Sequence, residues 1–479
     1  MALIRETEPI RKDVVVIGAG ISGLACAYRL KALGLNVAVI EASNHIGGAI
    51  TTDNVDGFLI ERGPNSTQGT EELLTLVEEL GISGDLMEGD PKAPAYVYFG
   101  GRLHAVPAGP SALLKSRLLS SLGKLRLFAE PLIPRRSSDQ EETVADFARR
   151  RIGREPAERL VAPFVSGIYA GDSEKLSVQA AFPRLANLES TYGGLIRGTI
   201  AKAREARRAR KSASAVLEKA APARRRLVSF TTGMSFLPRS LAWRLGEDLS
   251  IGCSEIVLRK EGSAGRDEQY RYEAEYVRDG RSERLRCKQL VIAATAFGAA
   301  GLIEPLSAEI GALLGEIEYP KLAVIHLAYD RASVENSLDG FGFLVAPSEG
   351  LNVLGCVWSS SLFAGRAPSG RVLLTTFAGG ARNPGITTLP ESELVSLVHA
   401  DLARALGIRS DPEVIAVTRW ERAIPQYNLG HATRVRRIEE LLKNVPGVRL
   451  IGNYLHGVAV GDCVKEADAR AREIASQLY

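Results

Sequence analysis

Residues 14–30 read VVVIGAGISGLACAYRL, and this stretch decides the fold. The four apolar residues before Gly18 predict a buried strand, and the residues after Gly23 have the composition of a helix. The glycines of the intervening turn matter because a pyrophosphate can approach the backbone only where no Cβ stands in the way. The helix that follows points its first N–H groups at the phosphate charge. Strand, glycine turn and helix in this order predict a dinucleotide-binding unit rather than a packing turn.

The next predicted strand, residues 36–40, supports this prediction because it ends in an acid, Glu41. A carboxylate there can accept hydrogen bonds from both ribose hydroxyls, which favours an adenosine without a 2′-phosphate. The chain then reaches Gly47 and Gly48, a pair that allows a sharp turn back over the cofactor. No second glycine fingerprint follows, so we expect FAD rather than a separate NAD(P)H domain.

The cysteines and histidines do not indicate a metal site. The five cysteines are widely spread, none forms CxxC, and the six histidines are scattered. We therefore expect reduced cysteines, mostly in the core, and no metal. A covalent flavin link through Cys463 is not expected, so FAD is predicted to be held non-covalently.

The length and net charge of the chain limit the classes of protein to which it can belong. A chain of 479 residues predicts two or three packed units, and a net charge of +4 does not indicate a nucleic-acid partner. No uncharged apolar run is long enough to span a bilayer, and residues 1–12 lack the apolar core of a secretory signal. These observations predict a cytoplasmic protein.

The order of predicted elements indicates an α/β (α+β) fold. We expect a Rossmann-type FAD domain built from separate segments, a mixed-sheet substrate domain and a helical lobe. The expected boundaries are 9–84, 227–297 and 436–479 for the FAD domain, 85–205 for the helical lobe, 206–226 for a basic linker and 298–435 for the substrate domain.

Two segments raise the question of a membrane surface. Residues 111–128 mix leucines with lysines and arginines, a pattern found both at membrane surfaces and on ordinary surface helices. Residues 202–226 are strongly basic, which fits either a solvated face or attraction to anionic lipid heads. Both readings stay open for each segment.

An ordered series of short motifs carries a family resemblance from about residue 13 to residue 475. The motifs are GPNS at 63–66, SGIYAGD at 166–172, AFP at 181–183, GFG at 340–342, SSSLF at 359–363, FAGG at 377–380, AIPQY at 423–427 and GVAVGDC at 457–463. In this order the chain resembles the oxygen-dependent protoporphyrinogen oxidases. The resemblance implies non-covalent FAD and six-electron oxidation of protoporphyrinogen IX to protoporphyrin IX, with O₂ reduced to H₂O₂. It also implies a helical lobe that contacts the inner face of a membrane from the cytoplasm.

The same resemblance, with the glycine motif, assigns residues to each half of the site. The residues expected to contact FAD are Gly18, Gly20, Ile21, Ser22, Gly23, Glu41, Ala42, Gly48, Ala49, Gly63, Pro64, Asn65, Ser66, Ile256, Val257, Val458, Ala459 and Val460. The substrate slot is expected to use Asn65, Gly167, Leu344, Val357 and Phe377. No catalytic base is expected, because the protein has only to hold a flat, apolar tetrapyrrole against the flavin.

One position departs from the family pattern. The segment before Gly100 and Gly101 has alanine at position 95, where the family has an arginine that pairs with a substrate propionate. A guanidinium fork is therefore missing where a carboxylate would be anchored. Arg102 lies nearby in sequence. Ala95 puts ordinary propionate recognition in doubt.

Other functions remain open alongside the leading one. Coproporphyrinogen III has more carboxylates and would call for more basic groups, so the absence of arginine at 95 argues against it. A flavin-bearing partner without catalytic activity is an alternative of another class. Homodimer formation and hand-over of product to a chelatase also stay open.

Overall fold

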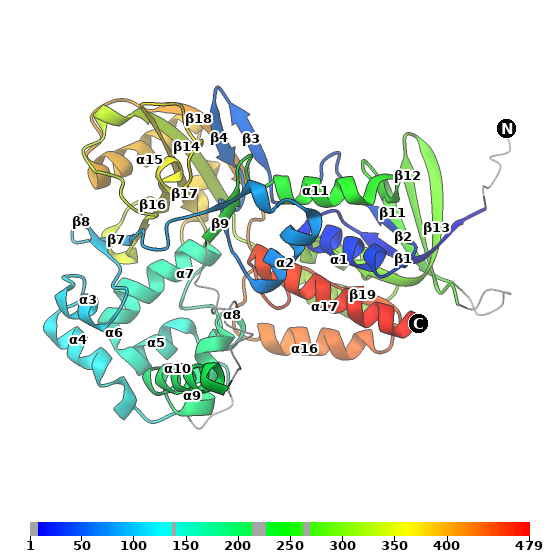
Figure 1. The fold of residues 1–479 in the computed structure, drawn as a ribbon, viewed down its shortest axis with the longest axis horizontal. Coiled ribbons are helices and arrows are strands. Elements are labelled where there is room, and N and C mark those ends of the chain that lie inside the picture. Colours follow the sequence, from blue (N-terminus) through cyan, green and yellow to red (C-terminus); the bar gives the residue numbers. More distant parts are fainter. Residues whose placement is uncertain (1–7, 137–139, 213–226, 262–268) are drawn as a thin grey trace.

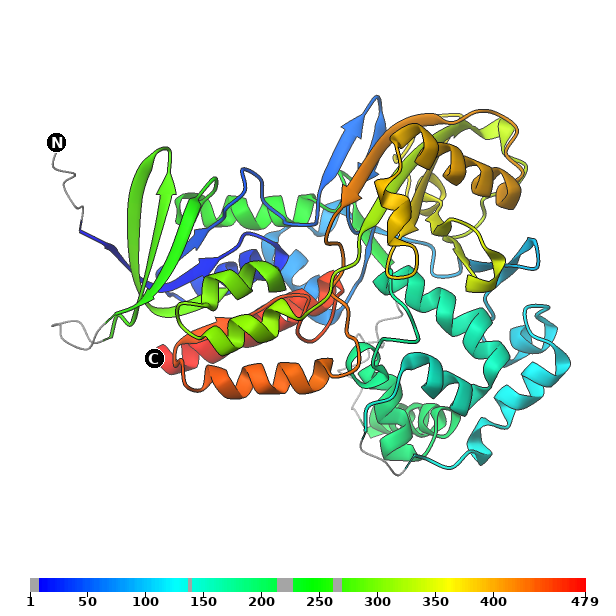
Figure 2. The same cartoon turned by 180° about the vertical axis from the view of Figure 1, so that it is seen from behind.

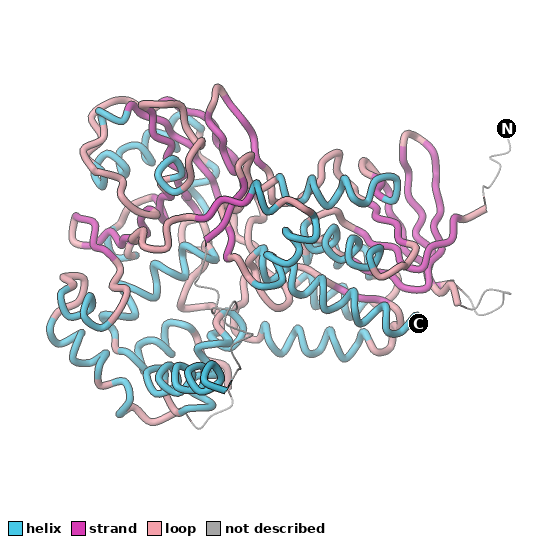
Figure 3. Tube along the Cα trace, viewed as in Figure 1, coloured by secondary structure: helices cyan, strands magenta, loops and turns pink. Residues whose placement is uncertain are grey.

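The computed structural model describes residues 8–136, 140–212, 227–261 and 269–479. Within these ranges the chain forms two large sheets and a separate group of helices (Figures 1 and 2). Figure 3 shows the strands gathered in two places and a lobe that is almost purely helical. Of the predicted basic linker, residues 206–212 end the helix α10 (Leu195–Ser212), and residues 213–226 lie outside the described residues.

The first sheet forms around the strand that opens the glycine motif. Its order is β10 (Leu249–Ser250), β2 (Val37–Ile40), β1 (Ile10–Ile17), β13 (Arg281–Ile292), β12 (Tyr272–Arg278) and β11 (Ser254–Lys260), with β19 (Val448–Leu450) also paired to β13. β1 runs parallel to β2 and β13, and its residues Val14, Val15 and Val16 are completely buried. A continuous β-branched run suits this position because helices cover both faces of the sheet.

Helices from distant parts of the chain cover the first sheet. On one face lie α1 (Ile21–Ala32), α2 (Glu71–Leu80), α11 (Phe236–Leu245) and α17 (Val460–Leu478). On the other face lie α12 (Ala296–Ile303), α13 (Ala308–Gly315) and α16 (His431–Leu442). The expected substrate segment 298–435 thus contains α13 and the start of α16, whose apolar sides pack on the first sheet because its second face also has to be covered.

The second sheet is mostly antiparallel. Its order is β18 (Glu413–Trp420), β14 (Leu322–Asp330), β17 (Arg371–Gly379), β16 (Val353–Val357), β15 (Gly342–Val345), β7 (Ala95–Phe99) and β8 (Arg102–Ala105). The helix α15 (Glu391–Leu406) buries its apolar side against one face. β7 and β8 come from the range 85–205 expected to be helical, where Tyr96, Val97 and Tyr98 favour a strand.

The remaining short strands form two smaller sheets. β3 (Thr52–Val55) pairs with β4 (Phe58–Glu61), and β9 (Leu227–Phe230) pairs with β5 (Thr67–Gln68) and β6 (Leu86–Glu88).

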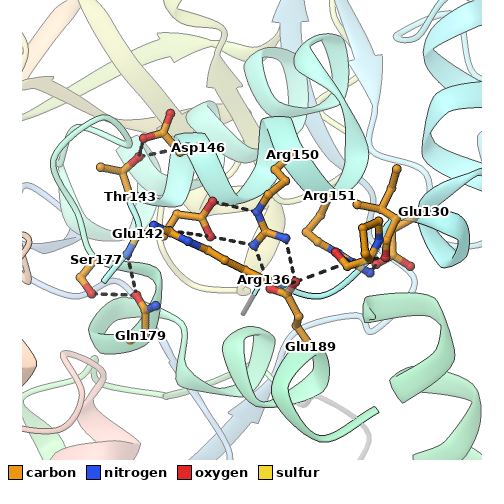
Figure 4. A network of polar contacts seen from close by, with 12 residues as sticks. Glu130, Arg136, Glu142, Thr143, Asp146, Arg150, Arg151, Ser177, Gln179 and Glu189 are labelled. Atoms are coloured by element: carbon orange, nitrogen blue, oxygen red, sulfur yellow. Dashed lines mark hydrogen bonds and ion pairs between the residues drawn. The ribbon is translucent and has the colours of Figure 1, made fainter. Parts of the chain in front are cut away.

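The helical lobe is held together by a buried ionic network. The lobe comprises α3 (Pro110–Lys115), α4 (Ser121–Phe128), α5 (Val144–Ile152), α6 (Arg154–Pro156), α7 (Ala162–Tyr169), α8 (Val178–Ala181), α9 (Pro183–Tyr192) and α10. Arg151 and Glu130 are fully buried and form an ion pair, seen at one end of the network in Figure 4. Glu130 also accepts hydrogen bonds from the backbone of Leu195 and Ile196, at 2.8 and 3.1 Å. It thereby satisfies the free N–H groups at the start of α10 and fixes that helix in place.

Among the described residues, no helix is both long enough and apolar enough to cross a membrane.

Candidate functional site

One cavity of about 2040 Å³ connects all three parts of the molecule. It begins at the turn between β1 and α1, passes residues 63–68, and spreads over the face of the second sheet that α15 does not cover. It then enters the helical lobe, where its wall is made by apolar side chains of α7, α9 and α10. A site of this shape can hold a dinucleotide at one end and a large apolar molecule at the other.

The three glycines of the motif have different roles. A Cβ on Gly18 would lie 2.8 Å from the carbonyl oxygen of Ala293, and one on Gly23 would overlap the carbonyl oxygen of Gly18. These two glycines therefore allow the turn and the close approach of helix and strand. A Cβ on Gly20 would meet no atom within 4 Å, and Gly20 lines the cavity. The absence of a side chain at Gly20 therefore leaves space for a ligand rather than for a neighbouring part of the chain.

Glu41 lies at the carboxyl end of β2, beside this turn. Its Oε2 accepts a 2.6 Å hydrogen bond from the backbone N–H of Ala19, and its Oε1 accepts two from Ser43, at 2.8 and 2.7 Å. These bonds orient the carboxylate at the cavity wall while leaving lone pairs free. An acid held here fits the ribose position expected from the sequence.

Two helix N-termini point toward the same end of the cavity. α1 begins at Ile21 and α17 begins at Val460, and both starts line the wall. The aligned peptide dipoles make such ends favourable for an anion. Phosphates are therefore the groups that this end fits best.

The segment that follows β4 presents polar groups that no protein atom satisfies. The Nδ2 of Asn65 and the Oγ1 of Thr67 are buried without a hydrogen-bond partner, and both residues line the cavity. The Oδ1 of Asn65 is held by the hydroxyl of Ser359 at 3.5 Å, which in turn bonds Thr375 at 2.8 Å. Because buried polar groups are normally paired, these atoms fit a ligand with polar edges. Sequence reasoning missed Thr67, although it directly follows the motif at 63–66.

The strand β11 brings one of its two expected residues to the cavity. Ile256 lines the wall, whereas Val257 does not and is 39% exposed. The pairing of β11 shifts between Ser254 and Val257, and Glu255 has a φ of 52°. This bulge turns Val257 away and places Ser254 and Glu255 at the wall, which the sequence pattern did not reveal.

All of the expected substrate residues lie around the apolar part of the cavity. The side chains come from neighbouring strands of the second sheet and from one helix: Ala95 on β7, Leu344 on β15, Val357 on β16, Phe377 on β17, and Gly167 on α7, with Asn65 beside them. A Cβ on Gly167 would lie 2.5 Å from the Cδ2 of Leu344, so this glycine makes room for the leucine.

Nearly all of the residues expected to contact the cofactor line the cavity. Those at the wall are Gly18, Gly20, Ile21, Ser22, Glu41, Ala42, Gly48, Ala49, Gly63, Pro64, Asn65, Ser66, Ile256, Val458, Ala459 and Val460. Gly23 and Val257 are the expected residues that do not line it. For Gly23 the reason is its packing against Gly18.

The cavity carries little positive charge. Among the described residues of its wall, Arg62 is the single lysine or arginine, and Arg102 is not part of the wall. Arg62 is already engaged by the carboxylate of Asp53 and by the hydroxyl of Thr418, the latter at 3.0 Å. Of the described residues, no group of histidines, cysteines and acids could hold a metal ion.

The comparisons with known proteins agree with this geometry. Residues 21–475 match the flavin-containing amine oxidoreductase family. The chain is 37% identical to the chloroplastic protoporphyrinogen oxidase of Nicotiana tabacum, over 96% of this chain and 85% of the relative. It is 28% identical to the coproporphyrinogen III oxidase of Bacillus subtilis, over 98% of this chain and 99% of the relative.

Solved structures show the same architecture. A candidate protoporphyrinogen oxidase from Exiguobacterium sp. 255-15 superposes with a TM-score of 0.77 at 25% identity, covering 98% of this chain and 99% of that one. A putrescine oxidase bound to putrescine superposes with a TM-score of 0.66 at 17% identity, covering 98% of this chain and 100% of that one. The chain belongs to the flavin-containing amine oxidoreductase family, in its protoporphyrinogen oxidase group.

Proposed function

We propose that this protein binds FAD non-covalently and oxidises protoporphyrinogen IX to protoporphyrin IX, with O₂ as the final acceptor and H₂O₂ as the second product. The observation that carries the proposal is the continuity of the cavity, which joins the wall around Gly20 and Glu41 to the apolar face around Leu344, Val357 and Phe377. Relatives that match nearly the whole chain are protoporphyrinogen oxidases, which supports the same reaction.

The residues at the dinucleotide end fit FAD. Gly20 would leave room for the pyrophosphate, the starts of α1 and α17 would face its charge, and Glu41 would bind the ribose. Asn65 and Thr67 would pair their unsatisfied polar atoms with the ring. A bound flavin supplies the two-electron chemistry that no side chain of this site supplies.

The protein's own contribution is to position the substrate and exclude water. Leu344, Val357 and Phe377 form an apolar wall against which a tetrapyrrole can lie flat, and Phe377 can pack against a pyrrole. The methylene bridge is then held beside the acceptor, which is an effect of proximity. The substrate's pyrrole nitrogens can release protons, so the absence of an obvious base is compatible with turnover.

A non-covalent cofactor is supported by the state of Cys463, one of three cysteines at the cavity wall with Cys253 and Cys356. Burial raises the pKa of its thiol to about 12. A thiol with this pKa remains protonated at neutral pH and is a poor nucleophile.

Coproporphyrinogen III is the second candidate substrate, and the bacterial relatives named for it keep it open. Its additional carboxylates would need cationic partners. The wall offers Arg62 alone among its described residues, and that guanidinium is already paired. The charge of the cavity therefore favours protoporphyrinogen.

The proposed location is the cytoplasm, with the helical lobe against the inner face of a membrane. Leu122, Leu125 and Leu132 are 78, 67 and 80% exposed on α4 and the turn after it. Exposed leucines on a lobe that also carries the basic helix α10 are typical of peripheral membrane contact. Co-sedimentation with anionic vesicles tests this part, and replacing the three leucines by serine should reduce it. Homodimer formation and product hand-over to a chelatase stay open alongside this proposal.

One experiment tests the reaction and the substrate together. The flavin-loaded protein is mixed anaerobically with protoporphyrinogen IX or with coproporphyrinogen III, and bleaching of the flavin band is followed. We expect faster bleaching by protoporphyrinogen, with recovery and H₂O₂ release when O₂ is admitted. Faster bleaching by coproporphyrinogen would transfer the proposal to that substrate, and bleaching by neither would favour a partner without catalytic activity.

A further inference from the structure

The loop that joins β19 to α17, residues 451–459, meets the cavity near both of its ends. Asn453 lines the cavity wall near the start of the loop, and Val458 lines it near the end, just before α17 begins. The residues between them, 454–457, do not line the wall. The distance that is kept between the two ends of the loop therefore decides where the start of α17 lies along the wall.

The hydroxyl of Tyr427 joins the two ends of this loop. It donates a 2.6 Å hydrogen bond to the carbonyl oxygen of Asn453 and accepts one of 2.9 Å from the backbone N–H of Gly457. Burial holds the pKa of this phenol well above its usual value, so the group stays a neutral O–H that can donate and accept at once. One side-chain atom thus satisfies a carbonyl and an N–H of the same loop.

The rest of Tyr427 is held by α16 and by the helical lobe. Its ring is 1% exposed, stacks on His431 with the ring centroids 4.2 Å apart, and packs against Tyr169 at 5.7 Å. Its carbonyl oxygen accepts a 2.8 Å hydrogen bond from the N–H of Ser177, the N-cap residue of α8. Tyr169 ends α7, the helix that carries Gly167 to the substrate wall. The hydroxyl therefore connects a rigid support, shared with the substrate wall, to the loop before α17.

We propose that Tyr427 is a positioning residue for the flavin reaction: its hydroxyl sets the loop 451–459 and the start of α17 against the cofactor. A helix start favours negative charge only where its N–H groups are aimed at that charge. Without the hydroxyl, the carbonyl of Asn453 and the N–H of Gly457 would have to find other partners, and the loop would move. A displacement of about 1 Å at a reacting group can lower a rate by roughly 100-fold. The inference rests on the proposed function, since it assumes that FAD occupies the dinucleotide end.

Tyr427→Phe tests the inference, because it removes the hydroxyl and keeps the ring between His431 and Tyr169. We expect FAD to leave the flavin-loaded variant about tenfold faster than the wild type, followed as flavin fluorescence after dilution. With FAD in excess and O₂ absent, the maximal rate of flavin reduction by protoporphyrinogen should fall by about tenfold. The porphyrinogen concentration that gives half of this rate should change by less than about twofold, because the substrate wall is not altered.

Tyr329→Phe is the matched control. Tyr329 is also 1% exposed and stacked on a histidine, His399, whose Nδ1 lies 3.1 Å from its hydroxyl. It lies on the face of the second sheet that α15 covers, outside the cavity wall. Each variant loses one buried hydroxyl contact, so both should have a lower Tm than the wild type. Only Tyr427→Phe should change FAD release and flavin reduction.

The inference is overturned if Tyr427→Phe releases FAD and is reduced at the same rates as Tyr329→Phe. It is also overturned if the variant differs only in the porphyrinogen concentration for half-maximal reduction, since Tyr427 would then act on the substrate and not on the cofactor. If porphyrinogen reduces neither the wild type nor the variant, the proposed function fails. The rate of FAD release still decides the role of Tyr427 in that case, so the two failures can be told apart.

Discussion

The cavity has a dinucleotide end, around Gly20 and Glu41, and a substrate end, on the second sheet around Phe377. The two ends differ in which protein atoms face a ligand. At the dinucleotide end the wall is mainly backbone: a glycine turn, two helix starts and one oriented carboxylate, Glu41. At the substrate end the wall consists of apolar side chains from neighbouring strands, such as Leu344, Val357 and Phe377. The first end is therefore suited to a ligand with charge at fixed points, and the second to a ligand with a large apolar surface.

This difference predicts how each end responds to mutation. A backbone cradle fails completely when one Cβ fills it, because no neighbouring atom can move to restore the space. A side-chain wall loses contact area in proportion to what is removed, and adjacent apolar groups compensate in part. We therefore expect large, all-or-none effects at the dinucleotide end and graded effects at the substrate end.

The largest expected effect comes from Gly20→Val. A Cβ at position 20 would meet no protein atom within 4 Å, so we expect the fold to persist while the flavin is lost. Flavin content after purification and thermal unfolding of the protein measure the two effects. Gly23→Val is the matched contrast, because its Cβ would overlap Gly18 and should lower stability itself. Full flavin content in folded Gly20→Val would contradict the proposed position of the pyrophosphate.

The sequence alone predicted the dinucleotide end of the cavity more completely than the substrate end. Residues 14–41 predicted strand, turn, helix, strand and acid correctly, because each step is local and is set by glycine, β-branched or acidic residues. The apolar face could not be derived in this way, since Leu344, Val357 and Phe377 look like ordinary core residues until the sheet forms. Only the family resemblance predicted that these three residues would contact the substrate.

Local patterns also failed where pairing with distant strands decides the geometry. The bulge in β11 that turns Val257 away depends on β12. The joining of β7 to β15 depends on strands more than 200 residues apart in the chain.

Glu61, the buried last residue of β4, should make stability depend on pH. Burial raises the pKa of this carboxyl from 4.5 to about 7, although Thr52 and the N–H of Met234 donate hydrogen bonds to it. The folded state then binds this proton more tightly than the unfolded state, so the stabilisation is present below about pH 4.5 and is lost as pH rises through about 7.

Glu61→Gln should remove this contribution. A glutamine can accept from Met234 and donate to Thr52, so the packing is retained. Between pH 5 and pH 8 the free energy of unfolding of the variant should rise relative to the wild type by roughly 2–3 kcal/mol. Denaturant titrations at several pH values measure this difference. Glu466, whose pKa is also raised to about 7 by burial, remains in both proteins, so a constant difference would show that Glu61 does not titrate in this range.

Ala95→Arg would place a positive charge at the apolar end of the cavity. Ala95 is exposed at the start of β7 and lines the cavity beside Gly342. If a propionate lies there, a charge-assisted hydrogen bond of roughly 1.5 kcal/mol should lower KM for protoporphyrinogen by about tenfold. Carboxylate inhibitors should bind more tightly in parallel.

Ala95→Gln is the control for size without charge. A lower KM and tighter inhibitor binding in Ala95→Arg, but not in Ala95→Gln, would support a propionate at this end. No gain in KM or in inhibitor affinity, with flavin content unchanged, would remove position 95 from propionate recognition.

Phe377→Ala tests whether mutations at the apolar wall have graded effects on activity. We expect this variant to have the smallest effect of those proposed. The ring lines the cavity, half-buried on β17, and its loss removes an aromatic contact worth on the order of 1 kcal/mol. We therefore expect kcat/KM for protoporphyrinogen to fall by about fivefold, with flavin content and spectrum unchanged. Leu374→Ala on the same strand is the control, because Leu374 is fully buried in the core on the opposite face. That variant should lower stability by roughly 2–5 kcal/mol and leave KM unchanged in the protein that remains folded. If Phe377→Ala instead abolished flavin binding, the two ends of the cavity would not be separable, and a backbone cradle beside an independent side-chain wall would be the wrong description of this site.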